Sequence, residues 1–414
     1  MIFSKLLRLL LQNKISAILF LSFFLRLIAA FSFIDLKKDY YWEYGEISKN
    51  IIYGNDYSLF YYNGNELEKH FFNYTNNAER FKSAYMPPGY VFFLTPFMLI
   101  KYVFLRNMLI IISQNIISVF SIYLLYKLCL RLFSQRIALI AAVLISIVPE
   151  FIYAVLSYTP TIIYHFLVIS LFLFLFIQEY SSRYAILTGL LIGIIIYFRA
   201  EFILFAVILI LNYFFKKNYK YAVTIFSTVI ILIFPWGLRN YYTFHKFIPF
   251  TTSYGLNLYR GNNPYSIGAW GDKKINNEIN KLKRDDSFEI NMNRIYENKA
   301  YNFIKNNPVK SIENAAIKFG YFWLFNWNEK RTNNFLYIIS TLFLLISFIY
   351  GLIKSFSWKK YSYFYLFFIY STLIAVIFFP MLRYQTMMKI MMVPFCAYGI
   401  EVFFNLIIKK LKFS

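Results

Sequence analysis

The sequence of 414 residues is poor in charge, cysteine and histidine. Only 15% of its residues are charged, whereas 59% are hydrophobic and the mean hydropathy is +0.50. This balance excludes a soluble fold of this length and predicts a polytopic helical membrane protein. The two cysteines, Cys129 and Cys396, lie in or beside apolar segments and provide no disulfide framework. His70, His165 and His245 are isolated and lack the spacing of metal ligands, so no metal site is predicted.

Other familiar functional patterns are also missing from the sequence. It contains no phosphate loop, no dinucleotide fingerprint and no Ser/His/Asp set. Acidic residues are scarce, since 20 Asp and Glu face 43 Lys and Arg, for a formal net charge of +23. Most of the cations flank apolar runs, which indicates contact with membrane lipids and not with nucleic acid.

The basic clusters predict how the chain crosses the membrane. The positive-inside rule places short basic clusters on the cytoplasmic side. One arrangement of about ten spans (10–11) puts all of these clusters inside, together with both termini. The first span is the apolar stretch 15–34, which is too long for a signal-peptide core and lacks a small-residue cleavage site. The other predicted spans lie near 107–127, 137–156, 160–178, 184–200, 201–215, 220–236, 335–353, 361–379 and 385–408.

This topology divides the chain into five parts and leaves two large loops on the outer face. The parts are the cytoplasmic start and first span (1–34), a first outer loop (35–106), a transmembrane core (107–236), a large outer loop with amphipathic helices (237–334) and the C-terminal spans (335–414). The apolar stretch 88–105 must not cross in this arrangement, so it is predicted to be a re-entrant or surface helix opened by Pro87 and Pro88. If it crossed, the orientation of everything after it would be reversed.

A turn rich in glycine and asparagine follows the span that ends at Pro235-Trp236. Arg239 and Asn240 stand at its start, at the membrane face where a lipid-linked phosphate would lie. A guanidinium group matches phosphate oxygens with two parallel hydrogen bonds, and glycines let backbone N–H groups approach an anion. An interfacial anchor followed by an ordinary turn would show the same composition.

Ionisable residues gather at the outer ends of the predicted spans. Such residues are costly at membrane depth unless they are paired or face water, so they are candidates for function. The alternative is snorkelling or a mutual ion pair, such as Arg199 with Glu201. The candidates are Asp35, Asp39, Glu43, Glu46, Glu150, Arg199, Glu201, Arg239 and Arg383.

Taken in order along the chain, these residues resemble a known family. The motifs are Asp39 with Glu46-Ile47-Ser48, then Pro87-Pro88-Gly89-Tyr90, Phe198-Arg199-Ala200-Glu201, Pro235-Trp236 with Arg239-Asn240, Asn257-Leu258 with Gly261-Asn262 and Pro264, and Arg383-Tyr384. They are similar to those of the C-type (GT-C fold) membrane glycosyltransferases. The resemblance is to the family 39 group, which is related to protein O-mannosyltransferases and lipid A aminoarabinose transferases.

The resemblance implies an activity and a set of roles. A polyprenyl-phosphate-linked sugar would be the donor, and transfer would invert the anomeric carbon without cofactor or metal. Asp39 would be the general base, with Asp35 and Glu43 as rivals because the spacing around Asp39 differs by about one residue. The phosphate-binding candidates are Arg239, Arg199, Arg383 and Asn240, and the substrate-binding candidates are Pro87, Pro88, Glu201, Tyr384, Asn257 and Asn262.

The resemblance also implies a location in the bacterial inner membrane, with the active site on the periplasmic side. An acceptor glycan, lipid or protein of the envelope fits such a site, and the sequence does not choose among them. Two other functions share the same features. One is a transporter or flippase of lipid-linked sugars, and the other is a polysaccharide polymerase or ligase.

Overall fold

The computed structural model describes residues 13–39, 41–62, 79–176, 181–264, 273–283, 285–326, 332 and 334–413. Within these ranges the chain is almost entirely helical, which confirms the predicted all-α class. The sheet found there has two strands, β1 (Ser58–Tyr62) and β2 (Glu79–Lys82), paired antiparallel with a register shift between Leu59 and Tyr61.

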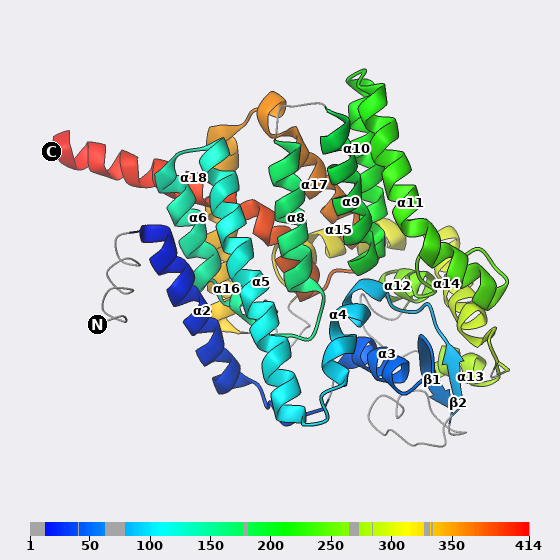
Figure 1. Cartoon of the computed structure of the whole chain (residues 1–414). Helices are drawn as coiled ribbons and strands as arrows, with labels where there is room; N and C mark the ends of the chain where they lie inside the picture. The colour runs from blue at the N-terminus through cyan, green and yellow to red at the C-terminus, as the bar shows by residue number, and fades with distance from the viewer. Residues whose placement is uncertain are drawn as a thin grey trace.

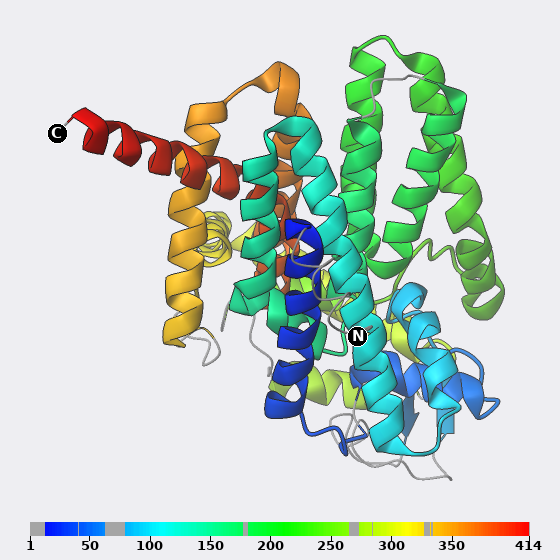
Figure 2. The same cartoon turned by 60° about the vertical axis from the view of Figure 1, so that its left-hand side comes forward.

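Six helices of the described part are long and apolar enough to cross a membrane. They are α2 (Lys14–Phe33), α5 (Val103–Leu132), α11 (Tyr219–Phe244), α16 (Phe335–Ser355), α17 (Trp358–Ile377) and α18 (Leu382–Phe413). The predicted first span therefore lies within one residue of α2. Figures 1 and 2 show α18 running obliquely across the other helices, so that its C-terminal half leaves the bundle.

The predicted count of about ten spans is not confirmed. The segment predicted to span at 137–156 is a bent pair, α6 (Gln135–Ile147) and α7 (Pro149–Leu156), with an angle of 54° between the two helices. Three further apolar helices are shorter than the ~20 residues that cross a bilayer. These are α8 (Thr161–Leu175), α9 (Ser182–Phe198) and the segment Ala200–Phe215, which contains η2 (Ala200–Phe202) and α10 (Ile203–Phe215).

The bend between α6 and α7 has a chemical cause. Pro149 has no N–H group, so it cannot donate to the carbonyl of Ile145 one turn earlier. The buried guanidinium of Arg26 on α2 takes that place and donates to the carbonyl oxygens of Ile145, at 2.8 Å, and Ser146, at 3.3 Å. The buried position of Arg26 at membrane depth is thus explained by the backbone carbonyls to which it donates.

The helix ends that carry basic clusters meet at one end of the bundle. The C-terminal ends of α5, α8, α10 and α16 lie together there, at the top of Figure 1. By sequence these ends carry or precede Lys127, Arg183, Lys216 and Lys354, so we call this the basic end.

The opposite end, which we call the site end, carries a layer of shorter elements. Figures 1 and 2 place the sheet and the first short helices there. The helices of the layer are α3 (Trp42–Ile52), α4 (Pro88–Met98), α12 (Tyr254–Gly261), α13 (Lys273–Asn280) and α14 (Phe288–Asn306), and α15 (Pro308–Trp323) follows α14 and packs against α17. The 11 residues of α4 extend about 16 Å, which is too short to cross a ~30 Å hydrocarbon layer. The predicted helix over 88–105 is therefore broken, because α4 ends at Met98 and α5 begins at Val103.

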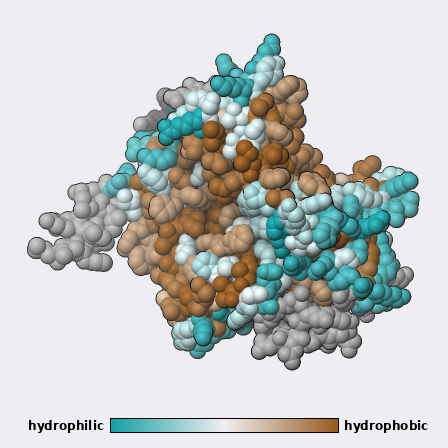
Figure 3. Space-filling view, turned by 45° about the vertical axis from the view of Figure 1, so that its right-hand side comes forward, coloured by the Kyte–Doolittle hydropathy of each residue, from teal (hydrophilic) through white to brown (hydrophobic). Residues whose placement is uncertain are grey.

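The surface of the bundle is suited to lipid. Figure 3 shows hydrophobic residues across the middle of one face, with hydrophilic residues gathered above them and over one side. Large apolar side chains are exposed on the bundle helices, among them Leu21 at 66%, Ile231 at 73% and Ile346 at 66%. Such extensive apolar exposure is typical of a surface in contact with acyl chains.

The predicted turn after Pro235-Trp236 is corrected by the structure. Helix α11 continues through Pro235 to Phe244, so Arg239 and Asn240 are helical. A proline inside a helix removes one backbone hydrogen bond. The hydroxyl of Tyr197 on α9 donates to the carbonyl of Leu232 at 2.7 Å and supplies a donor near this break. The turn comes after His245, which has a left-handed backbone.

Candidate functional site

Arginines from three elements surround Tyr384 at the site end. The guanidinium carbon of Arg199 lies 4.3 Å from the Tyr384 ring centroid, and that of Arg383 lies 5.4 Å from it. The guanidinium carbon of Arg260 lies 4.8 Å from the Phe379 ring centroid, and the Phe379 and Tyr384 rings are 5.9 Å apart. Cations over aromatic faces are stabilised by the ring quadrupole. We call Arg199, Arg260, Arg383 and Tyr384 the arginine cluster.

The local backbone explains why these side chains meet. Arg199 is the residue that ends α9 and begins η2, so it leaves the helix axis where the chain turns. Arg260 stands in the last turn of α12, and Arg383 and Tyr384 stand in the first turn of α18. The cluster is therefore built from helix ends.

A glutamate belongs to the same electrostatic environment. Burial raises the pKa of Glu43 on α3, while the positive charges of Arg383 and Arg260 act in the opposite direction. Burial likewise lowers the pKa of Arg260, and it raises that of Tyr85, which senses the charge of Glu43. A carboxylate of raised pKa among arginines is the arrangement expected of a general base beside an anion site.

An open pocket of about 360 Å³ lies against the cluster. Arg199 forms an ion pair with Glu201 at its edge, as the alternative prediction for these two residues expected. The rest of the lining is mostly aromatic and aliphatic, and includes Tyr164, Phe322, Tyr370, Ile374, Met387 and Met388. The structure thus brings three predicted residues, Arg199, Glu201 and Tyr384, to a pocket with an apolar wall, and Arg383 lies beside Tyr384.

Asp39, the first predicted base, lies in a different cluster of charged residues. The Asp39 carboxylate is 43% exposed and forms ion pairs with Arg106, at 2.6 Å, and Lys49, at 3.2 Å. Arg106 also donates to the Tyr41 hydroxyl at 2.7 Å. Burial raises the pKa of Tyr41 to about 12. Asp35 is more exposed, and its nearest cation is Lys38 at 3.9 Å.

The side chains of Arg239 and Asn240 donate hydrogen bonds to backbone carbonyls of the protein itself. Arg239 donates to the carbonyls of Ser83, at 2.6 Å, and Tyr57, at 3.1 Å, and to the Asn240 side chain at 3.0 Å. Asn240 donates to the Ile248 carbonyl at 2.9 Å. The predicted phosphate contact of Arg239 would have to replace these bonds. The structure therefore favours a role for this pair in holding the first outer loop against α11.

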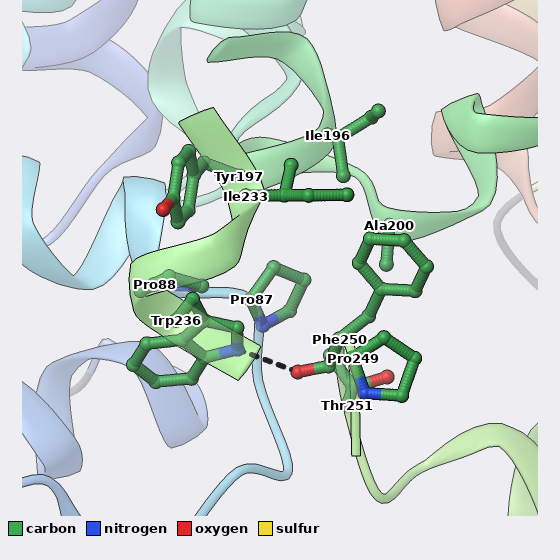
Figure 4. A pocket seen from close by; sticks show the side chains of 10 residues that line it. All are labelled: Pro87, Pro88, Ile196, Tyr197, Ala200, Ile233, Trp236, Pro249, Phe250 and Thr251. Carbon is green, nitrogen blue, oxygen red and sulfur yellow. Dashed lines mark hydrogen bonds between the residues drawn. The ribbon is translucent and has the colours of Figure 1, made fainter. Parts of the chain in front are cut away.

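The remaining predicted residues lie on either side of the cluster. Pro87 and Pro88 line a second pocket of about 220 Å³, shown in Figure 4, where the Trp236 indole donates to the Phe250 carbonyl at 2.7 Å. Asn257 is half-buried on α12. Asn262, at the end of α12, is buried and donates to two backbone carbonyls.

Sequence reasoning missed three charged residues of this end. They are Arg260, Lys318 and Glu289, each less than 9% exposed. Arg260 immediately precedes the Gly261-Asn262 motif and could have been found there. Glu289 accepts hydrogen bonds from the backbone of Ala84 and the hydroxyl of Thr252, and no feature of the sequence marked it.

The described residues contain no group of three or more His, Cys, Asp and Glu side chains that could hold a metal ion.

Comparisons with known proteins agree on the class. Residues 86–237 match the model of a family described as dolichyl-phosphate-mannose-protein mannosyltransferase. That segment includes α4, the whole predicted transmembrane core (107–236) and, within it, Arg199. The search of curated proteins found no match.

Solved structures of similar fold come from an archaeal enzyme. The chain resembles the oligosaccharyltransferase of Archaeoglobus fulgidus in complex with Zn and sulfate, with a TM-score of 0.56 and 15% identity over 97% of this chain and 50% of that one. It also resembles the complex of that organism's oligosaccharyltransferase AglB with an inhibitory peptide and a dolichol-phosphate, with a TM-score of 0.53 and 13% identity over 97% of this chain and 52% of that one. The chain thus spans about half the length of these relatives.

Together these findings support the GT-C fold that the sequence motifs predicted, and residues 86–237 resemble a glycosyltransferase family.

Proposed function

We propose that this protein transfers a sugar from a polyprenyl-phosphate donor to an acceptor of the cell envelope, with inversion at the anomeric carbon. The observation that carries the proposal is the arginine cluster, which gathers three cations, two of which act on the pKa of the half-buried Glu43. A phosphate leaving group requires cations and not a protonated acid, because it departs as a stable anion. The likeness of the fold to a protein solved with a dolichol-phosphate supports the donor class.

The two pockets suit the two ends of such a donor. Arg199 and Glu201 line the larger pocket, and the intervening Ala200 lines the smaller, apolar one in Figure 4. The η2 turn therefore separates a charged pocket from an apolar pocket. We propose that the sugar phosphate occupies the first and that the start of the isoprenoid chain passes the second, towards the lipid beside α9 and α11.

Glu43 is the favoured base, and Asp39 is the alternative. In the proposed step, the base removes the proton of the acceptor hydroxyl or amine as its oxygen or nitrogen attacks the anomeric carbon. The bond from that carbon to the phosphate oxygen breaks, and the electron pair leaves with the phosphate. Asp39 is held by Arg106 and Lys49, whereas Glu43 senses the arginines proposed to bind the leaving group.

The basic end is proposed to be cytoplasmic and the site end periplasmic, in a bacterial inner membrane. The positive-inside rule supports this, because the short connections at the basic end carry the lysine and arginine clusters. An envelope glycan, lipid or protein remains the proposed acceptor.

The decisive experiment measures sugar transfer by the purified protein in lipid nanodiscs. Short-chain polyprenyl-phosphate sugars and an extract of envelope acceptors serve as substrates, with and without a chelator. Transfer that persists with chelator and is lost in Glu43→Gln supports the proposal. Movement of lipid-linked sugar across a bilayer without transfer would instead establish a flippase, and extension of a long glycan donor would establish a polymerase or ligase.

A further inference from the structure

A buried lysine lies where the C-terminal ends of two helices meet behind the arginine cluster. The Lys318 side chain of α15 belongs to a residue only 1% exposed. Its ammonium donates to the Gly261 carbonyl at 3.0 Å, the Asn262 side-chain oxygen at 3.2 Å and the Phe378 carbonyl at 3.3 Å. Gly261 ends α12, and Phe378 follows α17. Carbonyls at helix C-termini lack intrahelical partners and carry partial negative charge, which an ammonium stabilises.

Asn262 and Gly261 complete the junction. The Asn262 amide donates to the carbonyls of Leu258 and Ile377, each at 2.8 Å, so it bridges α12 and α17. A Cβ atom on Gly261 would lie 1.4 Å from the Phe378 carbonyl oxygen, so only glycine allows this approach. We call Gly261, Asn262 and Lys318 the helix-end clamp.

The clamp adjoins the arginine cluster along the chain. Arg260 precedes Gly261, and Phe379, whose ring faces the Arg260 guanidinium, follows Phe378. The positive charges of Arg260 and Arg383 repel each other, since Arg383 is among the groups that lower the pKa of Arg260. Something must therefore hold α12 against the α17–α18 junction before an anion arrives. A preformed set of cations avoids reorganisation when the anion binds.

We propose that the helix-end clamp holds Arg260 beside Arg383 and so preforms the phosphate-binding site, with Lys318 as a positioning residue. This inference rests on the proposed function. Lys318 itself does not bind the phosphate, because its three donors already have three oxygen acceptors. The side chain of Asn262, which was predicted to contact substrate, likewise forms its hydrogen bonds within the clamp. Burial lowers the pKa of Lys318 to about 8, so the contribution of Lys318 to the clamp is expected to depend on pH near that value.

The test measures binding of a short-chain polyprenyl monophosphate to the purified full-length protein in nanodiscs. Lys318→Met is expected to weaken binding roughly 10- to 100-fold, the loss expected when a charge-assisted contact is no longer in place. Arg260→Gln should weaken binding by a similar factor, and the double variant should bind no more weakly than Arg260→Gln alone. Lys310→Met is the matched control, because Lys310 lies on the same helix with its side chain 57% exposed.

Two outcomes would overturn the proposal. Effects of Lys318→Met and Arg260→Gln that multiply in the double variant would show that Lys318 acts independently of Arg260. Unchanged amide hydrogen exchange over residues 254–264 in Lys318→Met would show that no clamp exists. The exchange measurement needs no substrate, so it judges the clamp even if the wild-type protein fails to bind polyprenyl monophosphate, a failure that would overturn the proposed function instead.

Discussion

Replacement of Glu43 by glutamine separates the proposed base from a structural residue. The amide keeps the size of the side chain but cannot accept the acceptor proton. A general base contributes roughly 100- to 10,000-fold in rate, or about 3–5 kcal/mol of the barrier. We therefore expect Glu43→Gln to lower the transfer rate by at least 100-fold with little change in donor affinity. The assay is transfer from a short-chain polyprenyl-phosphate sugar, with donor binding measured in parallel.

Stability provides the second half of this test. Burial raises the pKa of Glu43 in the folded protein above its value of ~4.3 in an unfolded chain. A raised pKa of an acid means that the folded state favours the protonated form, so this group contributes stability at low pH that is lost as the pH rises through the folded pKa. At neutral pH the charged Glu43 thus lowers the free energy of unfolding. Glu43→Gln should keep or raise the melting temperature at pH 7.

The same shift predicts the acid side of the pH profile. Wild-type activity should fall as pH drops below the raised pKa of Glu43, at a higher pH than for an ordinary glutamate. Asp39→Asn is the comparison variant, because it removes a carboxylate from the neighbouring ion pairs. Full activity in Glu43→Gln together with lost activity in Asp39→Asn would refute the reasoning and return the base to Asp39.

Three further predictions concern the cations and metal. Arg383→Gln should raise the Kd for polyprenyl monophosphate about tenfold or more, because one charge-assisted contact is lost, and an unchanged Kd would remove Arg383 from the phosphate site. Arg239→Met should instead lower the free energy of unfolding by about 1–3 kcal/mol, because it removes a donor from the buried Ser83 carbonyl and one of the two donors to the Tyr57 carbonyl, and the Kd for the sugar donor should stay within about twofold of wild type. Transfer should persist in a chelator, and restoration of a lost rate by added divalent ions would contradict the metal-free mechanism.

Hydropathy was a good guide to where helices lie and a poor one to how they cross. The stretch 15–34 became α2 almost residue for residue, because a long apolar run has one stable arrangement in a bilayer. The segment 137–156 looked equally continuous, but Pro149 breaks it and Arg26 stabilises the break from another helix. The sequence of the broken segment does not show which distant residue will donate to the carbonyls that the proline leaves free.

The site was predictable where the motif residues themselves face the cavity. Arg199, Glu201 and Tyr384 line one pocket, as a shared role would require. Asn262 and Arg239 are also motif residues, but their side chains hydrogen-bond backbone carbonyls. A sequence motif records that a residue type is needed at a position. It does not distinguish a ligand contact from a contact that shapes the site.

The partners of each arginine side chain distinguish these two roles. Arg26 and Arg239 direct their N–H groups at backbone carbonyls, which are permanent acceptors. Arg199 instead pairs with the Glu201 carboxylate, and both Arg199 and Arg383 lie over the Tyr384 ring. The buried Nε of Arg383 has no hydrogen-bond partner among the described residues, so this N–H group can donate to an oxygen acceptor. A buried donor without a partner costs free energy until an acceptor binds. The unpaired Nε of Arg383 therefore favours a site for an anion that binds reversibly, in contrast to the permanent backbone acceptors of Arg26 and Arg239.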